Sequence, residues 1–133
     1  MTEEHSMPLH HYLANRTIAM PRDTNPGGDI FGGWLVSQMD LAAGSVASTV
    51  AEGRVVTVAI NALTFHKPVF VGDELSCYAE LVKVGNTSMV IKVEAWVRRA
   101  LTKTGLKVTE GTFTFVAIDE NRVPRKIPQD QVN

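Results

Sequence analysis

The sequence predicts an α+β fold in which an antiparallel β-sheet wraps around one long helix. Two observations carry this prediction. The only convincing helical pattern runs over residues 30–52, and after residue 54 the chain consists of strand-like runs separated by turn residues. A helix and a sheet each have an apolar face to bury, so packing one against the other is the simplest arrangement. The 133 residues fit one domain, because a chain of this length forms a single core.

A short strand is expected before the helix. An apolar stretch runs from Tyr12 to Met20, and a loop follows over residues 21–28, where proline, glycine, aspartate and asparagine favour turns. Both ends of the chain are polar and contain proline, which indicates tails or surface loops. We therefore expect tails at residues 1–12 and 129–133 and the folded domain at residues 13–128.

One helix is predicted from Ile30 to Glu52. Asp29 or a neighbouring residue can cap its start, and Gly53 can supply the left-handed residue that ends it. At about 100° per residue, one side of the helix is apolar and faces the core: Leu35, Met39, Ala42, Val46 and Val50. The opposite side carries Gln38, Ser45, Thr49 and Glu52. Beside them runs a strip of mainly small residues that lets another chain or a ligand approach closely: Gly33, Val36, Ala43, Gly44, Ala47 and Ala51.

Four further strands are predicted after the helix, at residues 55–65, 74–84, 88–100 and 107–118. These segments are rich in Val, Thr, Ile, Phe and Tyr, which favour strands. The residues between them include glycine, proline, aspartate and asparagine, which favour turns. Together with the first strand they form a five-stranded antiparallel sheet around the helix.

The composition argues against several classes of protein. A net charge of -1 gives no general attraction to nucleic acid or to anionic membranes. No apolar run approaches the roughly 20 residues needed to span a bilayer, and the polar N-terminus is unlike a secretory signal. We therefore expect a cytoplasmic protein. The single Cys77 cannot form an intramolecular disulfide, and its strand-like surroundings favour a buried reduced thiol over a nucleophile.

The sequence also lacks the motifs of several kinds of site. The four histidines are not paired at the spacing of a metal site, so no metal is expected: His5, His10, His11 and His66. Neither a phosphate-binding Gly-Lys-Ser loop nor a Gly-x-Ser-x-Gly nucleophile elbow is present, which argues against a nucleotidase and a serine hydrolase.

Asp40 is the helical residue best suited to chemistry. It lies at the border between the apolar and polar sides, beside small residues, so a narrow group could reach a carboxylate in mainly apolar surroundings. Gly32 and Gly33 stand in the first turn, where unpaired N–H groups and the positive end of the helix dipole can bind a developing oxyanion. The alternative is that Asp40 simply begins the polar side of the helix.

The motifs around this aspartate are similar to those of a known family. Asp23-Thr-Asn25, Gly28-Asp-Ile-Phe-Gly-Gly-Trp-Leu35 and Ser37-Gln-Met-Asp40 resemble the YciA-type acyl-CoA thioesterases of the hotdog superfamily, which also includes the cytosolic long-chain acyl-CoA hydrolases. The resemblance covers residues 13–128 and continues through later segments: Gly53–Val58, Lys67-Pro68, Val71–Asp73, Lys83–Gly85, Val93–Val97 and Thr112–Ala117.

This resemblance implies a fold, an assembly and two site residues. The fold would be a hotdog, a five-stranded sheet curled around the central helix. Two chains would join sheets edge to edge, commonly as a trimer of dimers. Asp40 would be the nucleophile or general base, and Asn25 would reach the active site of the partner subunit. Without the resemblance, Asn25 would be a loop residue that bonds its own backbone. Pro26-Gly27 and Ala42-Ala43 depart from the family pattern, which puts the acyl-length preference in doubt.

Residues that bind coenzyme A are also expected. Its three phosphate groups need cationic partners, and Lys83, Arg98 and Arg99 are candidates for the nucleotide end. In the turn that begins at Gly85, the hydroxyl groups of Thr87 and Ser88 could bind the pantetheine arm. The alternative for each is an ordinary solvated or turn residue.

The sequence therefore predicts an acyl-CoA thioesterase that releases a free carboxylic acid and coenzyme A without a cofactor. One alternative is an enoyl-CoA hydratase, which needs a paired aspartate and histidine; the helix region supplies the acid but no histidine. Another is a non-catalytic acyl-CoA-binding regulator, in which the acid would be absent. A structural subunit would tolerate loss of both Asp40 and Asn25.

Overall fold

A computed structural model describes residues 4–5 and 12–129 of the chain. It contains one long helix, α1 (Gly32–Ala51), and a short 3-10 helix, η1 (Pro21–Asp23). The strands are β1 (Glu4–His5), β2 (Tyr12–Ile18), β3 (Val55–Phe65), β4 (Glu74–Val84), β5 (Ser88–Arg98) and β6 (Gly105–Ala117). His10 and His11, two of the histidines for which no metal site is expected, lie outside the described residues.

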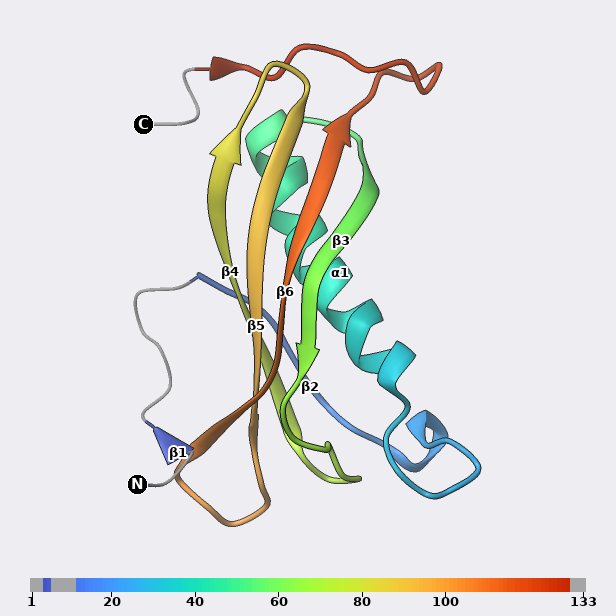
Figure 1. Cartoon of the computed structure of the whole chain (residues 1–133), viewed down its shortest axis with the longest axis vertical. Coiled ribbons are helices and arrows are strands. Elements are labelled where there is room, and N and C mark those ends of the chain that lie inside the picture. Colours follow the sequence, from blue (N-terminus) through green and yellow to red (C-terminus); the bar gives the residue numbers. More distant parts are fainter. Residues whose placement is uncertain (1–3, 6–11, 130–133) are drawn as a thin grey trace.

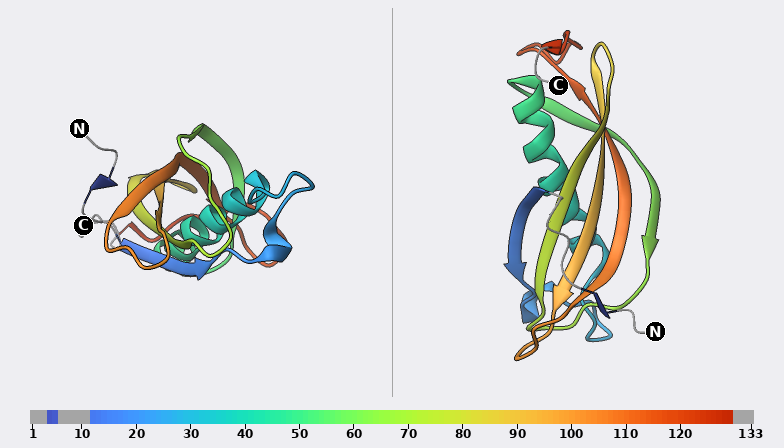
Figure 2. Two further views of the ribbon diagram at one scale, coloured as in Figure 1. Left: turned by 90° about the horizontal axis from the view of Figure 1, so that it is seen from below. Right: turned by 90° about the vertical axis from the view of Figure 1, so that its left-hand side faces the viewer.

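All strand pairs of the sheet are antiparallel. The order is β1-β6-β5-β4-β2, and β3 also pairs with β6. β2 and β3 are therefore the long edge strands, and the sheet curves around α1 between them (Figures 1 and 2). The predicted hotdog arrangement is confirmed. The two-residue β1 is an addition to it, because it pairs with the start of β6 in the region expected to be a tail.

The core lies between α1 and the concave side of the sheet. On the helix, Leu35, Met39, Ala42 and Val50 are buried as predicted, whereas Val46 is only partly buried. Alternate residues of β5 complete the core from the sheet side: Met89, Ile91, Val93, Ala95 and Val97. Burying each large aliphatic side chain stabilises the fold by roughly 1.5–3 kcal/mol. No helix in the described part of the chain is long and apolar enough to cross a membrane.

Both predicted helix ends need correction. The helix begins at Gly32, and its N-cap is Phe31, whose side chain makes no capping bond. Asp29 does not cap the helix, because it lies two residues before the N-cap; its backbone N–H and carbonyl both bond to Asn25 in the same loop. At the other end, the left-handed residue is Glu52 (φ 55°, ψ 44°) rather than Gly53.

The C-terminal part of the strip of small residues on α1, from Ala43 to Ala51, has a different role from the predicted one. Ala43, Ala47 and Ala51 have no exposed surface and pack in the core of the same chain. A Cβ at Gly44 would lie 3.6 Å from the ring of Phe115 on β6. These small residues let the sheet approach the helix closely, so they are not a surface for a ligand.

Candidate active site

Asp40 lies on the side of α1 that faces β3, and Thr57 of that strand contacts it. The Thr57 hydroxyl group donates a hydrogen bond of 2.7 Å to Oδ1 of Asp40. β3 runs back along the helix, which brings together two residues that are 17 positions apart. Nothing in the local sequence distinguishes Thr57 from the other threonines of the strands, so the sequence did not predict this contact.

The Asp40 carboxylate is available for chemistry. Its side chain is half-buried, and Oδ2 accepts no hydrogen bond from the described residues. Asp40 also forms no ion pair within residues 12–129. One oxygen is thus held by Thr57, while the other can attack a carbonyl group or take a proton from water.

The first turn of α1 presents two unused backbone donors. Gly32 and Gly33 are exposed, and their N–H groups have no acceptor in the described part of the chain. The first turn contains no acidic residue that could occupy them. At Gly33 a side chain would collide with the neighbouring ring, since an added Cβ would lie 2.6 Å from Phe31 Cε2. Such donors at the positive end of a helix can stabilise an oxyanion.

The amides and the carboxylate of one chain are too far apart to act on the same carbonyl group. Gly32 and Asp40 are eight residues apart on one continuous helix, which corresponds to about 12 Å along its axis. A reacting carbonyl must lie about 3 Å from both the donors and the attacking group. One chain therefore holds two separate parts of the predicted site.

Asn25 lies near the helix start, in the loop before it. Its Oδ1 accepts hydrogen bonds from the backbone N–H groups of Gly27 (2.9 Å) and Asp29 (3.2 Å). In this chain its oxygen therefore holds the loop together, while its NH2 group meets no acceptor among the described residues. Asn25 and Gly33 line the same hollow, of about 530 Å³, and Arg22 and Ser37 lie around it. The structure thus groups Asn25 with the helix start and separates both from Asp40.

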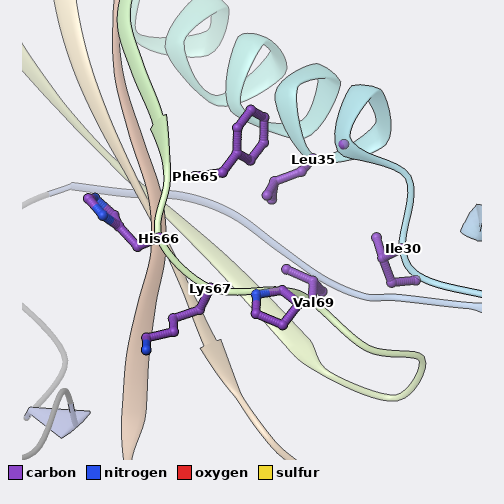
Figure 3. Close-up of a pocket in the computed structure, with 8 residues that line it drawn as sticks. Ile30, Leu35, Phe65, His66, Lys67 and Val69 are labelled. Carbon is purple, nitrogen blue, oxygen red and sulfur yellow. The ribbon is translucent and has the colours of Figure 1, made fainter.

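A second hollow, of about 310 Å³, lies between the helix start and the end of β3. Figure 3 shows Ile30, Leu35, Phe65 and Val69 around this space, whereas the side chain of His66 points away from the helix. The wall of this hollow is mainly apolar. Gly32 lines it, as Gly33 lines the hollow around Asn25.

The expected coenzyme A ligands occupy opposite ends of the sheet. Lys83 pairs in register with Val90, near the β4–β5 turn that contains the other three candidates, whereas Arg98 pairs with Glu74. The eight steps along the strand from Val90 to Arg98 span about 26 Å. One chain therefore does not bring the turn residues and the arginines together: Gly85, Thr87 and Ser88 at one end, Arg98 and Arg99 at the other.

Both arginines already have partners in the chain. Arg98 Nε donates a bond of 3.1 Å to Glu74 Oε1, and this bond lowers the pKa of Glu74. Arg99 Nη2 donates to the carbonyl oxygen of Pro68 (2.9 Å), and its guanidinium lies 4.7 Å from the centre of the Phe70 ring. Their side chains are anchored by the fold, so a ligand would have to share or displace these contacts.

Two further residues are engaged in structural roles. Cys77 is buried, and burial raises its pKa to about 12, so the thiol is not a nucleophile.

His66 Nε2 lies 2.9 Å from Glu110 Oε2, and this hydrogen bond lowers the pKa of Glu110. Asp40 has Thr57 as its hydrogen-bond partner, and no histidine of the described residues bonds it, so the paired aspartate and histidine of a hydratase are not seen there. Within residues 4–5 and 12–129, no cluster of three or more His, Cys, Asp and Glu could hold a metal.

A curved antiparallel sheet around a central helix is the hotdog fold, and the model of the thioesterase superfamily matches residues 27–101. An acyl-CoA thioester hydrolase of Zymomonas mobilis, described as uncharacterized, is 57% identical over 115 residues, covering 86% of this chain and 77% of that protein. The acyl-CoA thioester hydrolase YciA of Escherichia coli is 46% identical over 131 residues, with 96% and 98% covered. The chain belongs to the YciA family of acyl-CoA thioester hydrolases.

Solved structures agree with this assignment. A hexameric thioesterase of Yersinia pestis superimposes with a TM-score of 0.87 at 48% identity, covering 93% of this chain and all of that one (100%). The acyl-CoA hydrolase of Staphylococcus aureus, solved with butyryl-CoA, coenzyme A and coenzyme A disulfide, has a TM-score of 0.79 at 29% identity, with 86% and 70% covered. That hydrolase has also been solved as two mutants, in which an aspartate or a threonine is replaced by alanine.

Proposed function

We propose that this chain hydrolyses acyl-CoA thioesters to a free carboxylic acid and coenzyme A, with Asp40 as the reacting carboxylate. The observation that carries this proposal is the half-buried Asp40, which is held through one oxygen by Thr57 and has the other oxygen available. The two residues replaced in the S. aureus hydrolase, an aspartate and a threonine, are also 17 positions apart, as Asp40 and Thr57 are.

The reaction requires water, an oxyanion site and the carboxylate. The thioester carbonyl oxygen accepts hydrogen bonds from the Gly32 and Gly33 amides, which stabilise the charge that develops on it. Asp40 either attacks the carbonyl carbon, forming an anhydride that water then hydrolyses, or takes a proton from an attacking water. On either route the C–S bond breaks, the sulfur leaves as the thiolate of coenzyme A, and a proton neutralises it. No cofactor is needed for these steps.

We propose further that each active site is built from two chains. Asn25 and the helix start of one chain would polarise the carbonyl group, and Asp40 with Thr57 of a second chain would act on it. The separation of about 12 Å within one helix supports this arrangement. So does β3, an edge strand whose exposed apolar residues Val58, Ile60 and Phe65 invite a second chain.

The assembly would then be a homo-oligomer. The Yersinia pestis neighbour is a hexamer, and we propose a trimer of edge-to-edge dimers for this chain. In such an assembly Lys83 of one chain could approach Arg98 or Arg99 of another and hold the phosphates of coenzyme A, which one chain alone does not allow. The buried, unpaired Cys77 is consistent with action in the cytoplasm.

The experiment that tests the reaction measures free thiol released from a panel of acyl-CoA thioesters. Asp40→Asn should lower kcat by about 10²–10⁴, the usual contribution of a positioned base. Thr57→Val should have a smaller effect of the same kind, because it removes one hydrogen bond and leaves the carboxylate. Thermal unfolding of both variants checks that the fold persists. A wild-type protein that binds acyl-CoA without releasing thiol, or a fully active Asp40→Asn, would sink the proposal and favour a binding protein.

The two-chain site is tested by mixing two inactive variants. Asn25→Asp keeps the oxygen that bonds Gly27 and Asp29 but removes the NH2 group, so the loop should fold. Asp40→Asn supplies the second variant. When their chains are exchanged by unfolding and refolding together, half of the sites in a mixed dimer contain both native residues, and activity should return. Mixed oligomers that stay inactive would show that both residues act within one chain.

A further inference from the structure

β3 is a long edge strand that lacks the usual protection against pairing with another chain. Its 11 residues, Val55–Phe65, include no charged residue and no proline, although exposed strand edges commonly carry such residues to prevent contacts between chains. The other long edge strand, β2, contains the charged Arg16. An uncharged edge of this length suits an equally uncharged strand, and β3 of a second copy of this chain is such a strand.

Two residues of β3 mark where the two parts of the predicted site lie along the strand. Thr57 donates a hydrogen bond of 2.7 Å to Asp40. Phe65 lies beside the start of α1, since its ring would be 3.8 Å from a Cβ at Gly32, and Figure 3 shows its side chain on the helix side of the strand. The carboxylate therefore lies beside the first half of β3, and the unused amides lie beside its last residue.

We propose that β3 pairs antiparallel with β3 of a second copy, with Asn61 on the two-fold axis, opposite its own counterpart. This register rests on the proposed two-chain site. Residues equally far from the axis lie opposite each other in such a pair. Thr57 is four residues before Asn61 and Phe65 is four residues after it, so Thr57 of each chain lies opposite Phe65 of the other. Asp40 of each chain then lies beside the helix start of its partner.

Other symmetric registers separate the two parts of the site. If the axis moves by one residue, to Ile60, the opposite residue changes by two, and Thr57 lies opposite residue 63 instead of residue 65. This moves Asp40 about 7 Å along the partner strand, away from the partner's helix start. A reacting carbonyl group has to lie about 3 Å from both the carboxylate and the amides, so a shift of this size would disconnect them.

The shape of β3 also supports an axis at Asn61. The pairing of β3 with β6 is irregular at two places, between Thr57 and Ala59 and between Asn61 and Thr64, and each irregularity adds one residue to β3. One bulge therefore lies on each side of Asn61. Because a bulge changes the length and bend of a strand locally, two antiparallel copies match best when each half carries the same number of bulges.

The side chain of Asn61 suits a position opposite its own copy. Asn61 is exposed and pairs in register with Thr112 of β6, next to the buried Phe113. Since side chains alternate along a strand, Asn61 lies on the convex face of the sheet. An amide group is both donor and acceptor, so two asparagines can bond each other across the axis, whereas two like charges would repel there.

Asn61→Cys tests the register, because a residue on the axis can form a disulfide with its own copy. Directly opposite residues of an antiparallel pair have Cα atoms about 4.5 or 5.5 Å apart, which a disulfide can span. The native Cys77 does not compete, since it is buried and burial raises its pKa to about 12. Under mild oxidation most of the variant should run as a dimer on a non-reducing denaturing gel, and a reductant should reverse this.

Ile60→Cys and Thr64→Cys are the matched controls, because both positions are exposed on the same strand. With Asn61 on the axis, the two copies of residue 60 are about 8 Å apart and those of residue 64 about 20 Å apart. A disulfide does not bridge Cα atoms more than about 7 Å apart without backbone movement. Neither control should cross-link, and wild type should also stay uncross-linked.

Hydrolysis by the cross-linked Asn61→Cys protein then relates the register to activity. Its kcat/KM should match that of the reduced protein, because the disulfide holds the pair in the arrangement that forms the sites. If a control cross-links as well as Asn61→Cys, if none of the three does, or if cross-linking abolishes an activity that reductant restores, the register is wrong. If wild type hydrolyses no thioester, the proposed function fails, and the gel still decides the register.

Discussion

The two ends of the central helix are finished in different ways. At the C-terminal end, Arg125 Nη2 donates a hydrogen bond of 2.7 Å to the Ala51 carbonyl oxygen, and the left-handed Glu52 turns the chain away from the helix. At the N-terminal end, Phe31 supplies no side-chain cap, and the Gly32 and Gly33 amides have no acceptor in the described part of the chain. One end is closed by the chain itself, and the other is left open.

This difference separates stability from function. A helix end without partners forgoes a stabilisation of about 1 kcal/mol that a capping residue provides. An open N-terminus is nevertheless what an oxyanion requires, because its donors must be free when the substrate arrives. The closed end has no such role, and residues 117–125 pass over it to fix the start of β3. Changes at the open end should therefore affect activity, and changes at the closed end should affect stability.

The largest expected effect comes from Gly32→Pro. Proline is favoured at the first helical position and lacks only the N–H group, and the extended conformation of Phe31 (φ -65°, ψ 127°) is the one that a following proline requires. Losing one oxyanion donor should lower kcat by about 10²–10³. The free energy of unfolding should stay the same or rise by about 0.4–1 kcal/mol.

Gly32→Ala is the control for this prediction. It keeps the N–H group, and its Cβ would make an ordinary contact of 3.8 Å with the Phe65 ring. Initial rates and thermal unfolding of both variants check the expectation. Equal losses of activity in the two variants would assign the effect to bulk, and an active Gly32→Pro would exclude this amide as a donor.

The next effect is expected from Arg125→Ala at the closed end. The guanidinium bonds the carbonyl oxygens of Ala51 (2.7 Å) and Ile118 (3.1 Å), so its loss should lower the free energy of unfolding by about 1.5–3 kcal/mol. Activity per folded molecule should hardly change. Urea denaturation measures the first quantity, and Lys126→Ala, an exposed neighbour, is the control. If Arg125→Ala lost much of its activity at urea concentrations well below its own unfolding midpoint, the closed end would affect function as well as stability, which would contradict this prediction.

A smaller effect is expected from Gly53→Ala. An added Cβ at this position would lie 2.5 Å from Arg125 Nη2, so the arginine must move away from the helix end. The cost should be about 1–2 kcal/mol in wild type and much less in an Arg125→Ala background. A double-mutant cycle of unfolding free energies measures this coupling. Additive effects would show that Gly53 is required for another reason.

Much of the fold follows from local patterns. The predicted strand ranges 55–65 and 74–84 coincide with β3 and β4, because runs of β-branched and aromatic residues between turn residues are short-range signals. The helix ends were predicted less well. Gly53 is the residue type expected at a left-handed cap, yet Glu52 takes that conformation, and a Cβ at Gly53 would meet the side chain of Arg125 from the C-terminal segment. A contact between residues so far apart in the chain leaves no local signal.

The candidate site shows the same limit. Asp40, Asn25 and the glycine pair were selected from sequence motifs, and the structure neither tests nor contradicts their catalytic roles. Thr57 was missed because its approach to Asp40 depends on where β3 crosses the helix, and a register shift lies between Thr57 and Ala59. Shifting a strand by one residue turns every side chain to the other face, so the sequence pattern alone does not identify the partner of Asp40.

The sequence by itself determined the order of elements, the single core and the family, since these depend on hydrophobic periodicity, turn residues and ordered motifs. Tertiary structure decided which distant groups meet: Thr57 with Asp40, Arg125 with the helix end, and the two hollows beside the first turn. Local patterns depend on residues that are neighbours in the sequence. These contacts instead depend on the register and curvature of a sheet that closes around the helix.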